Sequence, residues 1–148
     1  MTRLRNGLAI ALLLGASAAL AGQPIVEVYK SATCGCCKEW VRHLRDNGFE
    51  VRAHDVPDPA AHRARAGIPD ALGSCHTALV DGYALEGHVP ASEVKRLLKE
   101  RPQARGLAVP GMPVGSPGME VGARVDPYAV LLIGADGKTY STYARYPN

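Results

Sequence analysis

The amino-acid sequence predicts an α/β domain in which a small sheet is flanked by helices. Two patterns lead to this fold class. Short runs alternate apolar and polar residues, which is typical of strands, and longer runs have apolar residues at helical spacing. The two kinds of run follow one another along the chain. Residues 22–148 are long enough to form one domain with a modest core.

The first half of this domain alternates strands with helices. Residues 24–30 alternate as a half-buried strand does, and residues 37–49 have the apolar spacing of a helix. Asn47-Gly48 near the end of that run is a helix C-cap signal. Residues 49–56 then predict a second strand, and prolines separate it from a short helix around 60–66.

The middle of the domain predicts two short strands and another helix. Residues 76–89 contain two strand-like runs around the turn Asp81-Gly82. Residues 90–102 have an apolar helical face, and Ser92 is the expected N-cap of that helix.

The last third is less regular. Residues 106–122 carry Gly or Pro at nearly every second position, so no regular element is expected there. Residues 128–146 predict a hairpin that turns at Asp136-Gly137. The order β-α-β-α-β-β-α matches a thioredoxin-like sheet flanked by helices, with an irregular Gly/Pro/Met loop and a C-terminal β-hairpin added.

The N-terminus has the pattern of a secretory signal peptide. Two arginines precede an uncharged apolar run at 7–20, and Ala19-Leu20-Ala21 is a small-x-small cleavage site. The run is short for a transmembrane helix, so an uncleaved anchor is the weaker alternative. We expect a signal peptide at 1–21 and a single soluble domain at 22–148 that is exported, with no stable membrane insertion after processing.

Charge and motifs exclude several function classes. Without the leader, the chain has 15 basic and 14 acidic residues, so no nucleic-acid or membrane-surface patch is expected. The sequence has no phosphate-binding glycine loop, dinucleotide fingerprint or Ser/His/Asp constellation.

The cysteines carry the strongest functional signal. Cys34, Cys36 and Cys37 lie within four residues at the start of the first predicted helix, and Cys75 is the only other cysteine. Unpaired N–H groups and the helix dipole stabilise thiolate there, which serves both disulfide exchange and metal binding. An exchanger needs two sulfurs, whereas a polynuclear soft-metal site gains from a third because each thiolate can bridge two ions. Bunched cysteines favour a reactive or metal site over a disulfide scaffold.

The predicted fold brings Cys75 towards the other three cysteines. It lies just before the third predicted strand, in the loop where a thioredoxin-like fold normally has a cis-proline. Ser74-Cys75-His76-Thr77 contains no proline, which argues against ordinary peptide-substrate docking. A structural disulfide from Cys75 to one motif cysteine is the alternative, and it leaves two thiols unexplained.

Methionine and histidine add candidate ligands. Met112 and Met119 both lie in the irregular loop, and thioether is a soft ligand that suits Cu(I). His76 adjoins Cys75, and His88 closes a predicted strand. The remaining histidines, among them His43 on the first helix, are expected at the solvated surface.

The ligand set selects the metal. Three or four thiolates with thioether nearby favour Cu(I), then Zn(II) or an iron–sulfur cluster. A structural zinc site usually takes two ligand pairs from separated knuckles, and the usual iron–sulfur spacings differ from this one. We therefore expect copper, with Cu(I) preferred and several ions per chain.

Several unusual strings also resemble one family. The segments VEVYKSATCGCCKEWVRHLRDNGFEV, SCHTALVDGYALEGHVP, GLAVPGMPVGSPGMEVG and PYAVLLIGADG are similar, in the same order, to the periplasmic CopG-type copper-resistance and metal-binding family. The resemblance implies a thioredoxin-like fold, copper handling, a multinuclear cysteine-bridged copper site and redox chemistry at that site.

Two functional hypotheses follow. In the first, a periplasmic copper-binding protein holds Cu(I) on Cys34, Cys36, Cys37 and Cys75, with Met112, Met119, His76 and His88 as outer or exchange ligands. The same centre could interconvert Cu(I) and Cu(II), and its partners would be copper ions and other periplasmic copper-handling proteins. In the second, the chain is a thiol–disulfide oxidoreductase with Cys34 as nucleophile and Cys37 as resolving thiol.

Overall fold

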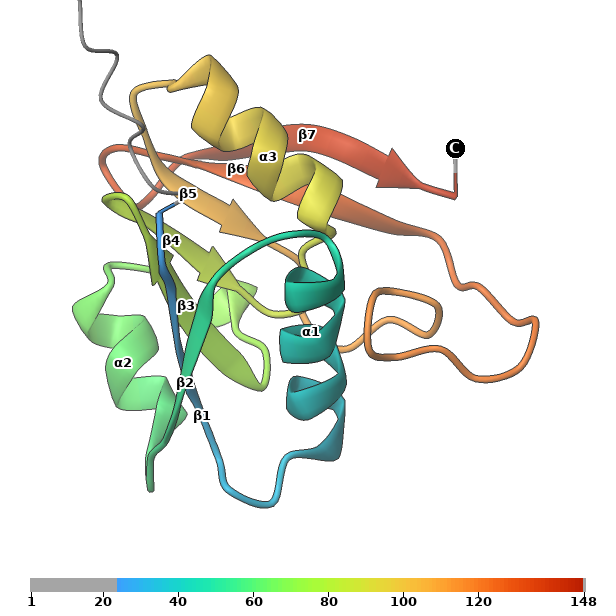
Figure 1. Ribbon diagram of the computed structural model, residues 1–148. Coiled ribbons are helices and arrows are strands. Elements are labelled where there is room, and N and C mark those ends of the chain that lie inside the picture. Colours follow the sequence, from blue (N-terminus) through green and yellow to red (C-terminus); the bar gives the residue numbers. More distant parts are fainter. Residues whose placement is uncertain (1–23, 148) are drawn as a thin grey trace, which may run out of the picture.

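The computed structural model describes residues 24–147, so the predicted signal peptide lies outside the described residues. Residues 24–147 form a mixed α/β fold with one seven-stranded sheet and three α-helices (Figure 1). Within this range, no helix has the length and apolar character needed to span a membrane.

The predicted order of elements is confirmed through the third helix, and the predicted C-terminal hairpin is β6–β7. The elements are β1 (Val26–Lys30), α1 (Gly35–Asp46), β2 (Val51–Asp55), α2 (Pro59–Arg65), the 3-10 turn η1 (Asp70–Leu72), β3 (His76–Val80), β4 (Tyr83–Glu86), α3 (Ala91–Glu100), β5 (Ala104–Ala108), β6 (Tyr128–Gly134) and β7 (Tyr140–Tyr146).

The strands lie in the order β2-β1-β3-β4-β5-β6-β7. Two pairs are parallel, β1 with β2 and β4 with β5, and a helix provides the crossover in each case. The other neighbouring pairs are antiparallel. Because β1 and β3 run in opposite directions with Lys30 opposite His76, the end of β1 lies beside the start of β3. This register positions the site described below.

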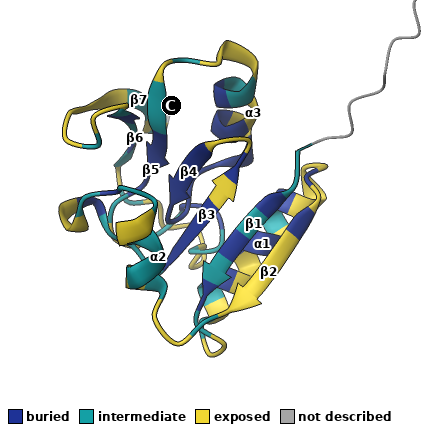
Figure 2. Ribbon diagram, turned by 90° about the vertical axis from the view of Figure 1, so that its left-hand side faces the viewer, coloured by how far each residue is buried: buried dark blue, intermediate teal, exposed yellow. Residues whose placement is uncertain are grey.

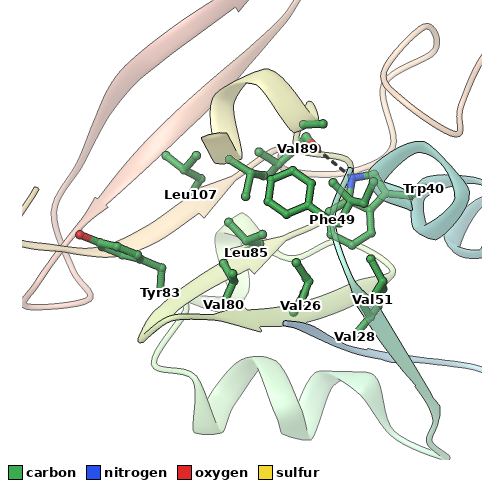
Figure 3. Packing of buried hydrophobic residues seen from close by; sticks show 14 of the residues in the cluster. Val26, Val28, Trp40, Phe49, Val51, Val80, Tyr83, Leu85, Val89 and Leu107 are labelled. Carbon is green, nitrogen blue, oxygen red and sulfur yellow. Dashed lines mark hydrogen bonds between the residues drawn. The ribbon is translucent and has the colours of Figure 1, made fainter. Parts of the chain in front are cut away.

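The sheet separates two hydrophobic clusters. The larger one joins α1 and α3 to one face, and its members include the fully buried Trp40, Leu85 and Leu97. The Trp40 indole N–H donates to the Val89 carbonyl at 2.9 Å, which satisfies the polar atom of this large side chain (Figure 3). The smaller cluster lies on the α2 face and includes Leu72. Strand β4 is buried along its length, whereas the edge strand β2 is mostly exposed (Figure 2).

Strand β5 corrects the expectation that residues 106–122 contain no regular element. Its last three residues, 106–108, fall in that range and pair with both β4 and β6. A Cβ at Gly106 would lie 1.7 Å from the Ala84 carbonyl oxygen, so glycine permits the close approach of β4 and β5. The strand was missed because its stability comes from two distant neighbours and not from a local alternation.

The start of α3 corrects two further expectations. The N-cap residue of α3 is Pro90, whose side chain makes no capping hydrogen bond. The prediction that Ser92 is the N-cap was therefore wrong. Instead, the Ala91 N–H donates to Nε2 of His43 at 3.0 Å. His43 is half-buried against α3, not solvated, and burial lowers the pKa of its imidazole. One side chain of α1 thus satisfies a free N–H at the start of α3.

Candidate metal centre

Two chain segments place the four cysteines together. Cys34 is the N-cap of α1, and its Sγ accepts a hydrogen bond from the Cys37 N–H at 3.3 Å. Cys36 lies in the first turn of the same helix. Cys75 immediately precedes β3, and the antiparallel pairing of β1 with β3 brings it beside the loop that enters α1. The predicted convergence of Cys75 on the motif is therefore confirmed.

The sulfur atoms form a compact group. We call Cys34, Cys36, Cys37 and Cys75 the thiol cluster, because their Sγ atoms all lie within 4.8 Å of one another. Cys34 and Cys37 form a disulfide, and Cys36 and Cys75 are free thiols. The Sγ of Cys36 lies 3.5 Å from that of Cys34 and 3.8 Å from that of Cys75. The alternative of a disulfide from Cys75 is wrong for this structure.

Two imidazoles extend the thiol cluster on the far side of Cys75. Its Sγ lies 3.3 Å from Nδ1 of His76 and 3.2 Å from Nε2 of His88. Both rings are fully buried, and the His76 ring lies 4.4 Å from the Trp40 ring, centre to centre. These three residues also have ligand atoms within 4.8 Å of one another.

The hydrogen bonding of His88 fixes its tautomer. Its Nδ1 lies 2.8 Å from the Pro117 carbonyl oxygen, which can only accept, so Nδ1 carries the proton. Nε2 then presents a lone pair to the Cys75 sulfur when the ring is neutral. Burial lowers the pKa of His88, so the neutral ring is favoured. The geometry suits either acceptance of a thiol proton or donation to a metal ion.

His76 is held neutral in the same way. Burial first, and then the neighbouring His88, lower its pKa to about 3. Its Nε2 is buried and has no hydrogen-bond partner among residues 24–147. A buried polar atom without a partner carries a free-energy cost, so this ring has an unused donor or acceptor beside the thiol cluster.

The protonation of Cys75 reflects its surroundings. Burial, followed by the charge of Cys36, raises the pKa of the Cys75 thiol to about 12. Two neighbouring thiolates repel each other in a partly desolvated site, so both cannot ionise without a cation. A soft metal ion would replace the protons and remove this penalty.

A buried carboxylate holds the segment that carries Cys75. The Glu86 side chain is fully buried; its Oε1 accepts from the Ser74 N–H at 2.7 Å and its Oε2 from the Thr77 hydroxyl at 2.6 Å. Arg63 lies 3.6 Å from the same carboxylate. Burial raises the pKa of Glu86 despite these partners. The role of Glu86 was not predicted, because a single Glu at the end of a strand does not indicate which residues it contacts.

The irregular loop contacts the segments that carry the thiol cluster. The Gly111 N–H donates to the Gly73 carbonyl at 3.1 Å, beside the Cys75 segment. Further along, Pro117 accepts from His88, as described above. A Cβ at Gly118 would lie 2.8 Å from both the Cys36 carbonyl oxygen and the Trp40 nitrogen, so the loop backbone touches the first turn of α1.

The two predicted methionine ligands are next in sequence to two of these contacts. Met112 follows Gly111 and is 52% exposed, whereas Met119 follows Gly118 and is half-buried. Both are next in sequence to residues whose backbone contacts one side of the site. The other histidines lie elsewhere: His54 pairs with Glu27 at the surface, and His62 stacks on Tyr29.

The fold and site define a class of small α/β proteins with a cluster of soft sulfur donors at the start of a helix. The family model described as "Protein of unknown function, DUF411" matches residues 72–119, the segment that contains Cys75 and the irregular loop. No curated protein sequence matches the chain.

Two solved structures are similar over most of the chain. The structure of copper resistance protein CopG in form 2 is 48% identical, has a TM-score of 0.81, and the match covers 85% of this chain and 100% of that one. Form 1 is 47% identical, with a TM-score of 0.80 and coverage of 86% and 100%. The chain belongs to the CopG copper-resistance family, as the sequence motifs predict. Together with the cysteine cluster, this relationship supports a copper-related function.

Proposed function

We propose that this protein is a periplasmic copper-binding protein of thioredoxin-like fold that contributes to copper resistance by holding Cu(I) in a cysteine-bridged, multinuclear site. The observation that carries the proposal is the gathering of four Sγ atoms within 4.8 Å of one another. Thiolate is a soft ligand that favours Cu(I), and one thiolate can bridge two ions. Copper is the cargo or substrate of this site.

The ligand roles follow from position. The Sγ of Cys36 lies 3.5 Å from that of Cys34 and 3.8 Å from that of Cys75, so Cys36 is the natural bridging ligand. His88 offers Nε2 beside Cys75, while its Nδ1–H is anchored to the loop. His76 is the second imidazole at that sulfur. Met112 and Met119, on the loop that contacts the cysteine-bearing segments, would act as exchange ligands during entry and release.

The disulfide connects copper binding to redox chemistry. Cleavage of the Cys34–Cys37 bond takes up two electrons and gives two thiolates. Oxidation of one Cu(I) to Cu(II) releases one electron, so two Cu(I) ions would be oxidised for each disulfide reduced. In the reverse direction, two Cu(II) ions would be reduced as the S–S bond forms. We propose that the site uses this exchange to interconvert the two copper states.

The strand topology supports the proposed thioredoxin-like fold, and the predicted signal peptide supports the proposed periplasmic location. A parallel β1-α1-β2 unit is followed by the antiparallel pair β3-β4 and α3, with the cysteines at the start of α1. That is the arrangement expected of a thioredoxin-like domain. The signal-peptide pattern at 1–21 supports export to the periplasm, where a disulfide can persist.

Anaerobic Cu(I) titration of the reduced domain against a chromophoric Cu(I) chelator tests the proposal. We expect several equivalents of Cu(I) per chain, with all four thiols protected from a thiol reagent. Cys36→Ser should lower both stoichiometry and affinity, and the disulfide form should bind less copper than the reduced form. Unchanged stoichiometry and affinity in Cys36→Ser would rule out its bridging role. At most one weakly held ion in the unaltered domain would overturn the multinuclear site.

A second candidate function is thiol–disulfide exchange with exported proteins. The observation that favours it is the Cys34–Cys37 disulfide at the N-terminus of α1, where the positive end of the helix dipole favours the thiolate that disulfide exchange requires. The Cys36 sulfur at 3.5 Å from Cys34 argues against it, because a third thiol invites misoxidation. Efficient insulin reduction by the metal-free protein, abolished in Cys34→Ser, would favour this function.

A further inference from the structure

A cavity of about 440 Å³ opens on the α2 side of the sheet. Its walls come from β1, α2, β3, the β3–β4 turn, β4 and β5. The side chains that matter here are Tyr29, His62, Arg65, Leu79 and Arg105. The volume lies within the range of small-ligand pockets, about 300–1,000 Å³.

The cavity is separate from the thiol cluster. Tyr29 and Leu79 alternate along their strands with Val28 and Ala78, which belong to the core cluster that includes Trp40. Side chains of successive strand residues point to opposite faces. The sheet therefore lies between this cavity and α1, and Figure 2 views the molecule from the α2 side.

The cavity collects arginines that have no acidic partner. Six of the ten arginines in the described residues pair with a carboxylate within 4.0 Å. The other four are Arg45, Arg65, Arg105 and Arg145, and two of these line the cavity. No Asp or Glu lines it. Thr77 also lines the cavity, and its hydroxyl donates a hydrogen bond to Glu86. The Glu86 carboxylate is itself paired with Arg63.

The two guanidinium groups differ in their attachment. The Arg105 Nη2 donates to the Ala135 carbonyl at 3.0 Å, which holds that side chain against the wall. Its Nε has no hydrogen-bond partner among residues 24–147. Arg65 is exposed on α2 and remains free to close on a ligand. The remaining wall is flat and partly apolar: the Tyr29 and His62 rings stack with centroids 4.1 Å apart, and Leu79 is 40% exposed.

We propose that this cavity binds a small oxyanion, a carboxylate or phosphate group, between Arg65 and Arg105. A guanidinium presents paired N–H donors that match two oxygens of such a group. The Tyr29, His62 and Leu79 surface would contact an apolar or flat remainder of the ligand. This inference is independent of the copper site, because it uses neither the cysteines nor the residues that hold them.

Amide and arginine side-chain NMR shifts of the disulfide form, titrated with inorganic phosphate and separately with benzoate, test the proposal. Phosphate tests charge alone, whereas benzoate adds a flat apolar portion. We expect saturable shifts at Tyr29, Gly82 and Arg105 with at least one of the two anions. Tighter binding of benzoate than of phosphate would show that the aromatic wall contacts the ligand. Equal affinity for the two anions would show that the arginines alone bind it.

Substitution of the two cavity arginines tests whether each of them binds the anion. Arg65→Ala and Arg105→Ala should each weaken binding by about tenfold or more, since each removes a charge-assisted hydrogen bond. Arg65 is exposed, so its replacement tests binding without disturbing the fold. Arg145→Ala is the matched control, because Arg145 also lacks an acidic partner but lies outside the cavity on β7. Absence of saturation with both anions, or equal weakening by Arg145→Ala, would overturn the proposal.

Discussion

Cys75 is the residue at which the thiol cluster meets the two buried imidazoles. Its sulfur faces Cys36 on one side and the nitrogens of His76 and His88 on the other. Burial and the neighbouring thiol keep it protonated, since its pKa is raised to about 12. A cation that displaces this proton gains two neutral imidazole neighbours at once. The position of Cys75 is therefore decisive for the proposed copper site, and Glu86 fixes the segment on both sides of it.

Replacement of Glu86 tests this positioning role, which rests on the proposed function. Glu86→Ala leaves the partly buried Ser74 N–H without its acceptor, and we expect the free energy of unfolding to fall by about 1–3 kcal/mol. Because Cys75 would be held less firmly, Cu(I) affinity should fall by about tenfold or more. Glu86→Gln keeps an acceptor for Ser74 and should retain more of both.

The measurements are chemical denaturation and competition for Cu(I), made on variants that are folded by circular dichroism. Glu100→Ala is the control, since Glu100 is a glutamate bonded to Tyr143, away from the cysteines. A loss of stability in Glu86→Ala with unchanged Cu(I) affinity would show that Glu86 is structural only. Failure of the unaltered protein to bind Cu(I) would instead reject the proposed function and leave the structural role of Glu86 intact.

At the scale of elements, a hydrogen bond between a side chain of α1 and the backbone of α3 joins these two helices. The Ala91 N–H at the start of α3 has its acceptor in His43 of α1. Only a neutral imidazole can accept this bond. Burial lowers the pKa of His43, although Glu120 and Asp46 both act to raise it. The contact is thus favoured at neutral pH and opposed by acid.

His43→Ala should lower the free energy of unfolding by about 1 kcal/mol near pH 8, the usual contribution of a helix cap. The folded-state pKa of His43 lies below its ordinary value of 6.5, so its contribution is complete above pH 6.5 and declines as the pH falls below that value. The difference between the two proteins should therefore shrink in acid. Urea unfolding of both proteins at pH 8 and pH 5 measures this difference.

Ser92→Ala is the control for the same experiment. The Ser92 hydroxyl has only a 3.4 Å contact with the Tyr146 hydroxyl, so its loss should change stability by less than the loss of His43. If Ser92→Ala were the more destabilising variant at pH 8, the assignment of the α3 cap to His43 would be wrong.

At the scale of the whole molecule, the sheet keeps two chemical environments apart. The face towards α1 carries the larger hydrophobic cluster, and the thiol cluster lies at the start of α1. The face towards α2 carries the cavity lined by Arg65 and Arg105. Central strands that are buried on both faces, such as β4, hold these two sides in a fixed relationship.

Leu85→Ala and Leu79→Ala test the importance of this central packing. Leu85 on β4 is fully buried, so its truncation should cost about 2–5 kcal/mol of unfolding free energy. Leu79 on the neighbouring β3 is 40% exposed, and its truncation should cost about 1 kcal/mol or less. Thermal and urea unfolding compare the two variants. Equal losses would contradict the division of the sheet into a buried core face and an open face.

Much of the fold was predictable because it depends on local pattern. Alternation identified β1 and β2, helical spacing identified α1 and α3, and turn residues identified the hairpin β6–β7. The thiol motif at the start of α1 was equally visible, and it indicated a soft-metal or redox site. Strand β5 was missed because its pairing partners lie far away in sequence, and Ser92 was chosen as a cap because His43 lies 48 residues from Ala91.

The sequence by itself determined the order of elements through α3, the placement of three thiols at one helix N-terminus and the soft character of the candidate ligands. These properties follow from side-chain chemistry and from periodicity over a few residues. Only the tertiary structure decided that Cys75 meets Cys36, that Pro117 fixes the tautomer of His88, that Glu86 holds the Cys75 segment, and that Arg65 and Arg105 share a cavity. Each of these contacts joins residues distant in sequence, and such contacts arise from strand register and packing, which no local pattern specifies.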